Sequence, residues 1–188
     1  MEKVRVGLIG SQFISGIHFQ ALQSVSAAEV LAVASPTANH ARDFAAERSI
    51  DRWFRDYREL VEMAELDMVV LGLPNDLHCD AVLTAAAAGK HVVVEKPMAL
   101  NLDECDRMIA ACQAAGVKLM YAEELCFAPK YVRLKQLLDE GALGSPFLIK
   151  QSEKHDGPHA PWFWDVERSG GGVGLEIEGG CGLEGRSQ

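Results

Sequence analysis

The chain has 188 residues, 48% of them hydrophobic, which suffices for one large or two small packed domains. Its formal net charge of −9 opposes binding to nucleic acid or to an anionic membrane surface, so we expect a small-molecule ligand. No apolar run is long enough to span a bilayer, and the five cysteines, odd in number and without C-x-x-C spacing, predict neither disulfides nor a metal site.

The first predicted element, a strand over residues 4–9, follows the start of the chain directly, which leaves no room for a signal peptide and predicts a cytoplasmic protein. Its short apolar run is typical of a central buried strand. Gly10 marks a tight turn before a helix that begins near Phe13. The backbone N–H groups and the positive dipole end of such a helix favour a pyrophosphate above the turn.

The spacing of this turn departs from the dinucleotide fingerprint G-x-G-x-x-G/A, because Gln12 and Ser15 occupy the second and third positions. Ser15 is small enough for close packing of helix and strand. Gln12 places a long side chain where a diphosphate needs bare backbone. A cofactor turn and an ordinary strand-to-helix turn therefore both remain open.

A second apolar strand, predicted over residues 29–34, ends in Ser35-Pro36-Thr37 without the acidic residue that receives adenosine ribose hydroxyls in NAD sites. The hydroxyls of Ser35 and Thr37, with His40 and Arg42 in the next turn, are compatible with NADP and favour it. The alternative is that these hydroxyls only cap the following helix.

The strand predicted over residues 68–72 leads into Leu73-Pro74-Asn75 at the sheet edge where open α/β folds bind ligands. Asn75 or Asp76 is equally compatible with capping the helix predicted over residues 78–88.

Glu95-Lys96-Pro97 follows the next strand, predicted over residues 91–95 and too apolar for an exposed position. Pro97 biases Lys96 toward an extended backbone and so restrains it. A lysine beside a nicotinamide and an alcohol carbon can orient the hydroxyl or relay its proton. The alternative is a surface Lys-Pro turn.

Further along, we predict a helix from Asn101 to Gly116, a strand over 117–122, a helix over 128–140 and a strand over 147–152. Five sequence groups appear in order: Gly7-Leu8-Ile9-Gly10 with His18, Leu73-Pro74-Asn75 with His78, Ala88-Gly89-Lys90-His91-Val92 before Glu95-Lys96-Pro97, Phe127-Ala128-Pro129, and Ser169-Gly170-Gly171-Gly172. Together they resemble the glucose-fructose oxidoreductase, inositol dehydrogenase and rhizopine-catabolism (Gfo/Idh/MocA) family of NAD(P)-dependent oxidoreductases.

This resemblance implies an α/β fold, with a Rossmann-type doubly wound parallel sheet followed by the start of a second, incomplete α/β domain. We place the first domain at residues 1–124 and the second, with a glycine-rich tail, at 125–188. Family members exchange a hydride between nicotinamide and a sugar or polyol carbon, and the protein contributes positioning.

The resemblance also implies roles for particular residues. It places Ser35 at the adenosine ribose and makes Lys96 the catalytic lysine. Glu95 and Lys96 would lie at the nicotinamide ribose and the substrate. The remaining cofactor contacts implied, at the diphosphate and along the cofactor, are Gly10, Gln12, Phe13, Ile14, Leu73, Pro74, Asn75 and His78.

The segment 155–165 carries aromatic rings and hydrogen-bonding groups of the kind that bind sugars: His155, His159, Trp162 and Trp164. An aromatic loop packed under the sheet is the alternative. Family members continue after the glycines with an Asp and, four residues later, an acid/base His. Glu176 and Gly180 stand at those positions, so that imidazole is absent.

Eight of the 17 glycines fall between Gly170 and Gly185, which costs backbone entropy and adds almost no apolar area. A lone strand at 147–152 would expose unpaired edges and favour self-association. We therefore hypothesise a shortened or frame-altered version of a longer oxidoreductase. Two functions remain open: a sugar or polyol oxidoreductase, or a non-catalytic dinucleotide-binding domain.

Overall fold

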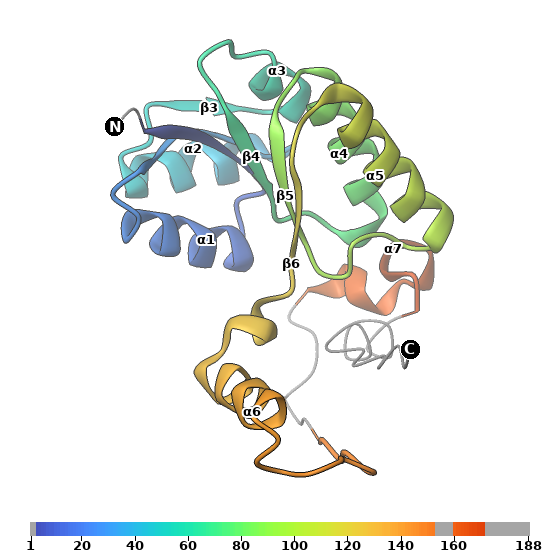
Figure 1. Ribbon diagram of the computed structural model, residues 1–188. Coiled ribbons are helices and arrows are strands. Elements are labelled where there is room, and N and C mark those ends of the chain that lie inside the picture. The colour runs from blue at the N-terminus through green and yellow to red at the C-terminus, as the bar shows by residue number, and fades with distance from the viewer. Residues whose placement is uncertain (1–2, 153–159, 172–188) are drawn as a thin grey trace.

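In the computed structural model, which describes residues 3–152 and 160–171, six parallel strands form one sheet in the order β3-β2-β1-β4-β5-β6 (Figure 1). The strands are β1 (Val4–Ile9), β2 (Ala28–Ala34), β3 (Arg52–Phe54), β4 (Met68–Leu71), β5 (His91–Glu95) and β6 (Leu119–Ala122). The strand order reverses between β1 and β4, which opens a crevice at the carboxyl ends of these two strands. The predicted doubly wound sheet is confirmed.

Helices cover both faces of the sheet. They are α1 (Phe13–Gln23), α2 (Ala38–Arg48), α3 (Tyr57–Val61), α4 (His78–Ala87) and α5 (Leu102–Ala115). Figure 1 shows α1 and α2 on one face and α3, α4 and α5 on the other. Beyond the carboxyl edge lie α6 (Pro129–Asp139), α7 (Val166–Ser169) and the short 3₁₀ turns η1 (Asn75–Leu77), η2 (Glu124–Phe127) and η3 (Pro161–Trp164).

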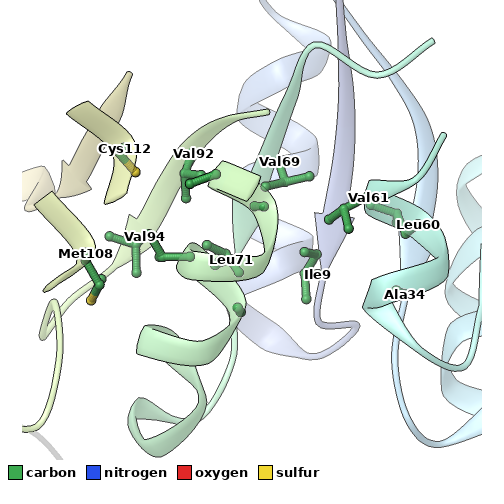
Figure 2. Packing of buried hydrophobic residues seen from close by; sticks show 14 of the residues in the cluster. Ile9, Ala34, Leu60, Val61, Val69, Leu71, Val92, Val94, Met108 and Cys112 are labelled. Atoms are coloured by element: carbon green, nitrogen blue, oxygen red, sulfur yellow. The ribbon is translucent and has the colours of Figure 1, made fainter. Parts of the chain in front are cut away.

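Two hydrophobic clusters form the core, one on each face of the sheet. Alternation along β1 sends Val6 and Leu8 into the cluster beneath α2 and Ile9 into the opposite one. Figure 2 shows the larger cluster, in which strand and helix side chains interdigitate: Ile9, Leu71, Val92, Val94, Leu60, Val61, Met108 and Cys112. The sheet edge that carries the candidate site is therefore held from both sides.

An ion pair joins β1 to the start of β4 at the opposite, amino edge of the sheet. The Asp67 carboxylate accepts hydrogen bonds from the Arg5 backbone N–H at 2.8 Å and from its guanidinium at 3.0 and 3.1 Å. These bonds lower the pKa of Asp67 to about 2. They reinforce the pairing of the two strands that form the crevice.

The prediction of a strand over residues 147–152 is wrong. The segment has no strand pairing, and Phe147 is 97% exposed. The run Phe-Leu-Ile favours a strand locally, but a strand forms only beside a partner. All six strands of the described residues belong to the sheet that ends with Ala122.

Candidate active site

The glycine turn after β1 is fixed by the close approach of two strand ends. Gly10 has φ +114°, and a Cβ there would lie 2.2 Å from the carbonyl oxygen of Gly72, directly after β4. A Cβ on Gly72 would in turn lie 2.7 Å from Oγ of Ser15. Ser15 is buried in the first turn of α1. Helix α1 therefore packs tightly against the end of β4, as a dinucleotide-binding turn requires.

The N-terminus of α1 fits an anionic group. Gln12 is exposed in an extended conformation at the N-cap and makes no capping hydrogen bond, and the first turn carries no acidic residue. Ser11 Oγ is buried without a hydrogen-bond partner in the described part of the chain. Backbone N–H groups at a helix start together with such a hydroxyl suit a diphosphate.

At the end of β2, Ser35 is nearly buried and its backbone N–H donates to the carbonyl of Phe54. Thr37 occupies the N-cap position of α2, but its side chain makes no capping hydrogen bond, so the capping alternative is not observed. His40 lines a groove between α1 and α2, whereas Arg42 pairs with its neighbour Asp43 at 3.0 Å.

The loop after β4 is held by contacts with distant residues. Asn75 is 2% exposed, and its Nδ2 donates to the carbonyl of Ser169 at 3.0 Å. Asp76 pairs with Arg168 at 3.3 Å. Neither side chain caps α4, whose N-cap is Leu77, so that alternative is not observed either.

His78 lies beneath this loop and is fully buried. Its Nδ1 is 2.9 Å from the carbonyl oxygen of Pro97, and its Nε2 is 3.0 Å from that of Leu73. Burial lowers the pKa of His78, whereas the contacts with the backbone of Leu73 and Pro97 raise it. The ring lies between the two loops at the sheet edge and contacts both.

The end of β5 carries a hydrogen-bonded pair that the sequence analysis did not assign. His18 of α1 and Glu95 approach to 2.7 Å between Nε2 and Oε1. The other oxygen of Glu95 accepts the backbone N–H of Lys96 at 3.0 Å. His18 belongs to the first of the five sequence groups, but nothing local to the sequence indicates that it contacts a residue 77 positions away.

Gly10, Gly72, Glu95 and Lys96 therefore meet at one edge of the sheet, because β1, β4 and β5 are adjacent and parallel. A family model described as an oxidoreductase family with an NAD-binding Rossmann fold, GFO_IDH_MocA, matches residues 4–123. The chain belongs to this family.

Relatives of this Gfo/Idh/MocA chain include dehydrogenases and reductases. It is 28% identical to the myo-inositol 2-dehydrogenase of Thermotoga maritima, across 93% of this chain and 51% of that protein. It is 31% identical to the 1,5-anhydro-D-fructose reductase of Ensifer adhaerens, across 92% of this chain and 53% of that protein. The chain thus spans about half the length of the curated relatives it matches.

Solved structures agree with this membership. An NAD-binding oxidoreductase from Klebsiella pneumoniae superposes with a TM-score of 0.77 at 30% identity, covering 90% of this chain and 49% of that one. The scyllo-inositol dehydrogenase of Lactobacillus casei, solved with bound NAD(H) and scyllo-inositol, has a TM-score of 0.72 at 25% identity, covering 77% and 43%. Within residues 3–152 and 160–171, no helix is long and apolar enough to cross a membrane.

Part of the predicted substrate segment can be located in this Gfo/Idh/MocA chain. Trp162 stacks on Phe163 with ring centroids 3.9 Å apart, and Trp164 is 72% exposed on η3. The segment η3–α7 contacts η1 through Ser169 and Arg168, near α4 and α5 in Figure 1. The predicted substrate residues His155 and His159, and Glu176 and Gly180, lie outside the described residues.

The end of β6 adds two groups that the sequence analysis did not single out. Glu123 is 9% exposed, and burial together with the charge of Glu124 raises the pKa of its carboxyl. Burial, reinforced by Glu123, raises the pKa of Tyr121 to about 12. Because Ala122 is paired with Glu95, Glu123 lies at the same edge as Lys96.

Proposed function

We propose that this chain forms the dinucleotide-binding part of an oxidoreductase that exchanges a hydride between a nicotinamide and a sugar or polyol carbon. The observation that carries the proposal is the convergence of the Gly10 turn and Glu95-Lys96 on one sheet edge. A bound dinucleotide supplies the hydride acceptor or donor at its nicotinamide ring. The chain's own residues bind the cofactor, orient the substrate hydroxyl and exchange its proton.

In this proposal the α1 N-terminus, with Gly10, Gln12, Phe13 and Ile14, holds the diphosphate. Leu73, Pro74, Asn75, His78 and Glu95 line or support the path of the cofactor toward the nicotinamide. Lys96 orients the substrate hydroxyl and exchanges its proton. The hydrogen bond from the Lys96 backbone N–H to the Glu95 carboxylate restrains the main chain from which this side chain extends.

The substrate class is inferred from the relatives, which include an inositol dehydrogenase and an anhydrofructose reductase. Trp162 and Trp164, with His155 and His159, are proposed as substrate contacts, because aromatic faces beside hydrogen-bonding groups suit sugar rings.

For the cofactor, we propose NADP as the preferred form, since Ser35, Thr37 and His40 offer donors and no carboxylate occupies positions 35–37.

For the compartment, we propose the cytoplasm, since Cys79, Cys105, Cys112 and Cys126 are free thiols, as expected in a reducing environment.

A second candidate is a dinucleotide-binding domain without turnover. It is favoured by Gly180, which stands where the family has its acid/base histidine. In this case the chain binds NADP or NAD but transfers no hydride to any polyol.

The test combines nicotinamide absorbance assays over a panel of sugars and polyols with calorimetric titration of NADPH and NADH. Lys96→Ala should abolish turnover and leave cofactor affinity within about tenfold, since the diphosphate end supplies most of the binding energy. Lys118→Ala is the matched control, because Lys118 is exposed at the opposite edge of the sheet.

An unchanged rate in Lys96→Ala would remove this lysine from the mechanism. Tight cofactor binding by the wild-type chain without turnover would select the second candidate. Failure to bind either dinucleotide would reject both.

A further inference from the structure

The contact between His18 and Glu95 joins the first helix to the far end of the candidate site. The two side chains are 21% and 9% exposed and lie 2.7 Å apart. A carboxylate oxygen only accepts hydrogen bonds, so the imidazole donates from Nε2. Withdrawing a carboxylate from water is costly unless hydrogen bonds replace the lost water, and His18 supplies one.

The Glu95 carboxylate is held from two directions. Oε1 faces His18, and Oε2 accepts the backbone N–H of Lys96 at 3.0 Å. Two fixed contacts on different oxygens set the plane of the carboxylate. Each oxygen retains a second lone pair, so this group can still accept hydroxyl protons from a ligand.

Helix α1 reaches both ends of the site. Its first turn follows Gly10 and faces the proposed diphosphate position, and His18 lies five residues after Phe13, about 7.5 Å along the helix axis. The turn that would hold the diphosphate and the group that orients Glu95 are therefore parts of one rigid element.

We propose that His18 is a positioning residue, which holds the Glu95 carboxylate in the orientation that receives the hydroxyls of the nicotinamide ribose. Through Glu95 it also fixes the main chain at Lys96. This inference rests on the proposed function, because it assumes a dinucleotide whose nicotinamide half lies over the end of β5. It predicts that His18 contributes to the binding of the nicotinamide half of the cofactor and not to that of the adenosine half.

The experiment is calorimetric titration of the full chain with matched whole and partial ligands. NADPH is paired with 2′-phosphoadenosine 5′-diphosphate, and NADH with ADP, because each partial ligand keeps the diphosphate and lacks only the nicotinamide nucleoside. His18→Ala should weaken binding of the whole dinucleotide about tenfold, the usual effect of losing a hydrogen bond to a charged group. Binding of the partial ligand should change less than about twofold.

Two variants serve as controls. His18→Gln keeps a donor at a similar reach and should restore at least half of the lost affinity. Gln23→Ala changes an exposed residue at the end of the same helix and should bind both ligands as the wild type does.

A cycle with Glu95→Gln tests whether His18 acts through Glu95. If it does, His18→Ala should have little further effect on dinucleotide affinity once Glu95 is changed. Fully additive losses would overturn the proposal.

Other outcomes also decide. Equal weakening of the whole and partial ligands in both His18 variants would indicate a general structural role and overturn the inference. Unchanged dinucleotide affinity in His18→Ala would overturn it as well. If the wild-type chain binds the partial ligand but not the dinucleotide, the nicotinamide half does not lie over the end of β5 and the inference is wrong. If it binds neither ligand, the proposed function itself is wrong.

Discussion

Glu123 lowers the stability of the folded protein when its carboxyl is ionised. It is a nearly buried carboxyl at the end of β6, close to the candidate catalytic lysine. Burial is the largest cause of its raised pKa, and repulsion from Glu124 adds to it. An ionised carboxylate at this position is therefore less stable than one in the unfolded chain.

Replacing Glu123 with Gln should stabilise the protein near neutral pH. Because the folded-state pKa lies above the unfolded value of 4.5, the favourable contribution of the protonated group is present below that value and is lost as the pH rises. In urea unfolding near pH 7, we expect Glu123→Gln to raise the free energy of unfolding by about 1 kcal/mol. Near pH 4 the variant and the wild type should have the same free energy of unfolding. The exposed Glu29→Gln is the control. A variant less stable than the wild type near pH 7 would show that the charged form is favoured.

At the scale of elements, the site depends on how closely β1, β4 and α1 approach. Gly10 and Gly72 both lack room for a Cβ, and the obstacle at Gly10 is the backbone carbonyl of Gly72 rather than a flexible side chain. The η1 turn is held differently, through Asn75 and Asp76, by the segment that ends in α7. One part of the site is thus fixed by backbone packing and another by polar contacts across the sequence.

Gly10→Ala should destabilise the fold far more than an alanine at another glycine of positive φ. Gly116 has φ +67° and open space around its Cβ position, so Gly116→Ala should cost about 1 kcal/mol from backbone strain alone. Gly10→Ala adds a backbone clash and should cost more than about 3 kcal/mol, as measured by urea unfolding. Equal losses in the two variants would mean that the strand ends separate easily.

At the scale of the whole molecule, apolar side chains collect on the surface after α6. Leu143, Phe147, Leu148 and Ile149 are between 53% and 97% exposed. Clustered exposed apolar groups of this kind mark surfaces that associate. No strand forms at 147–152, and these side chains remain open to a partner.

We expect the chain to self-associate through this segment as its concentration rises. The double variant Phe147→Ser/Ile149→Ser should weaken dimerisation at least about tenfold, measured by sedimentation velocity. Leu102→Ser is the control, because Leu102 is 80% exposed on α5, outside this segment. A wild-type chain that stays monomeric at every accessible concentration would contradict this expectation.

Local sequence patterns predicted the alternation of strands and helices, the glycine turn at Gly10 and the position of Glu95-Lys96-Pro97 after a buried strand. These features follow from apolar periodicity and from backbone preferences that act over a few residues. The same local signals predicted a strand at 147–152, which did not form because pairing requires a second strand.

The side-chain contacts at the sheet edge depend on how distant parts of the chain pack together. The pairs His18–Glu95 and Asn75–Ser169 join residues 77 and 94 positions apart, and the burial of Glu123 depends on what surrounds the end of β6. Such contacts arise when separate elements pack onto one sheet, so no local pattern encodes them.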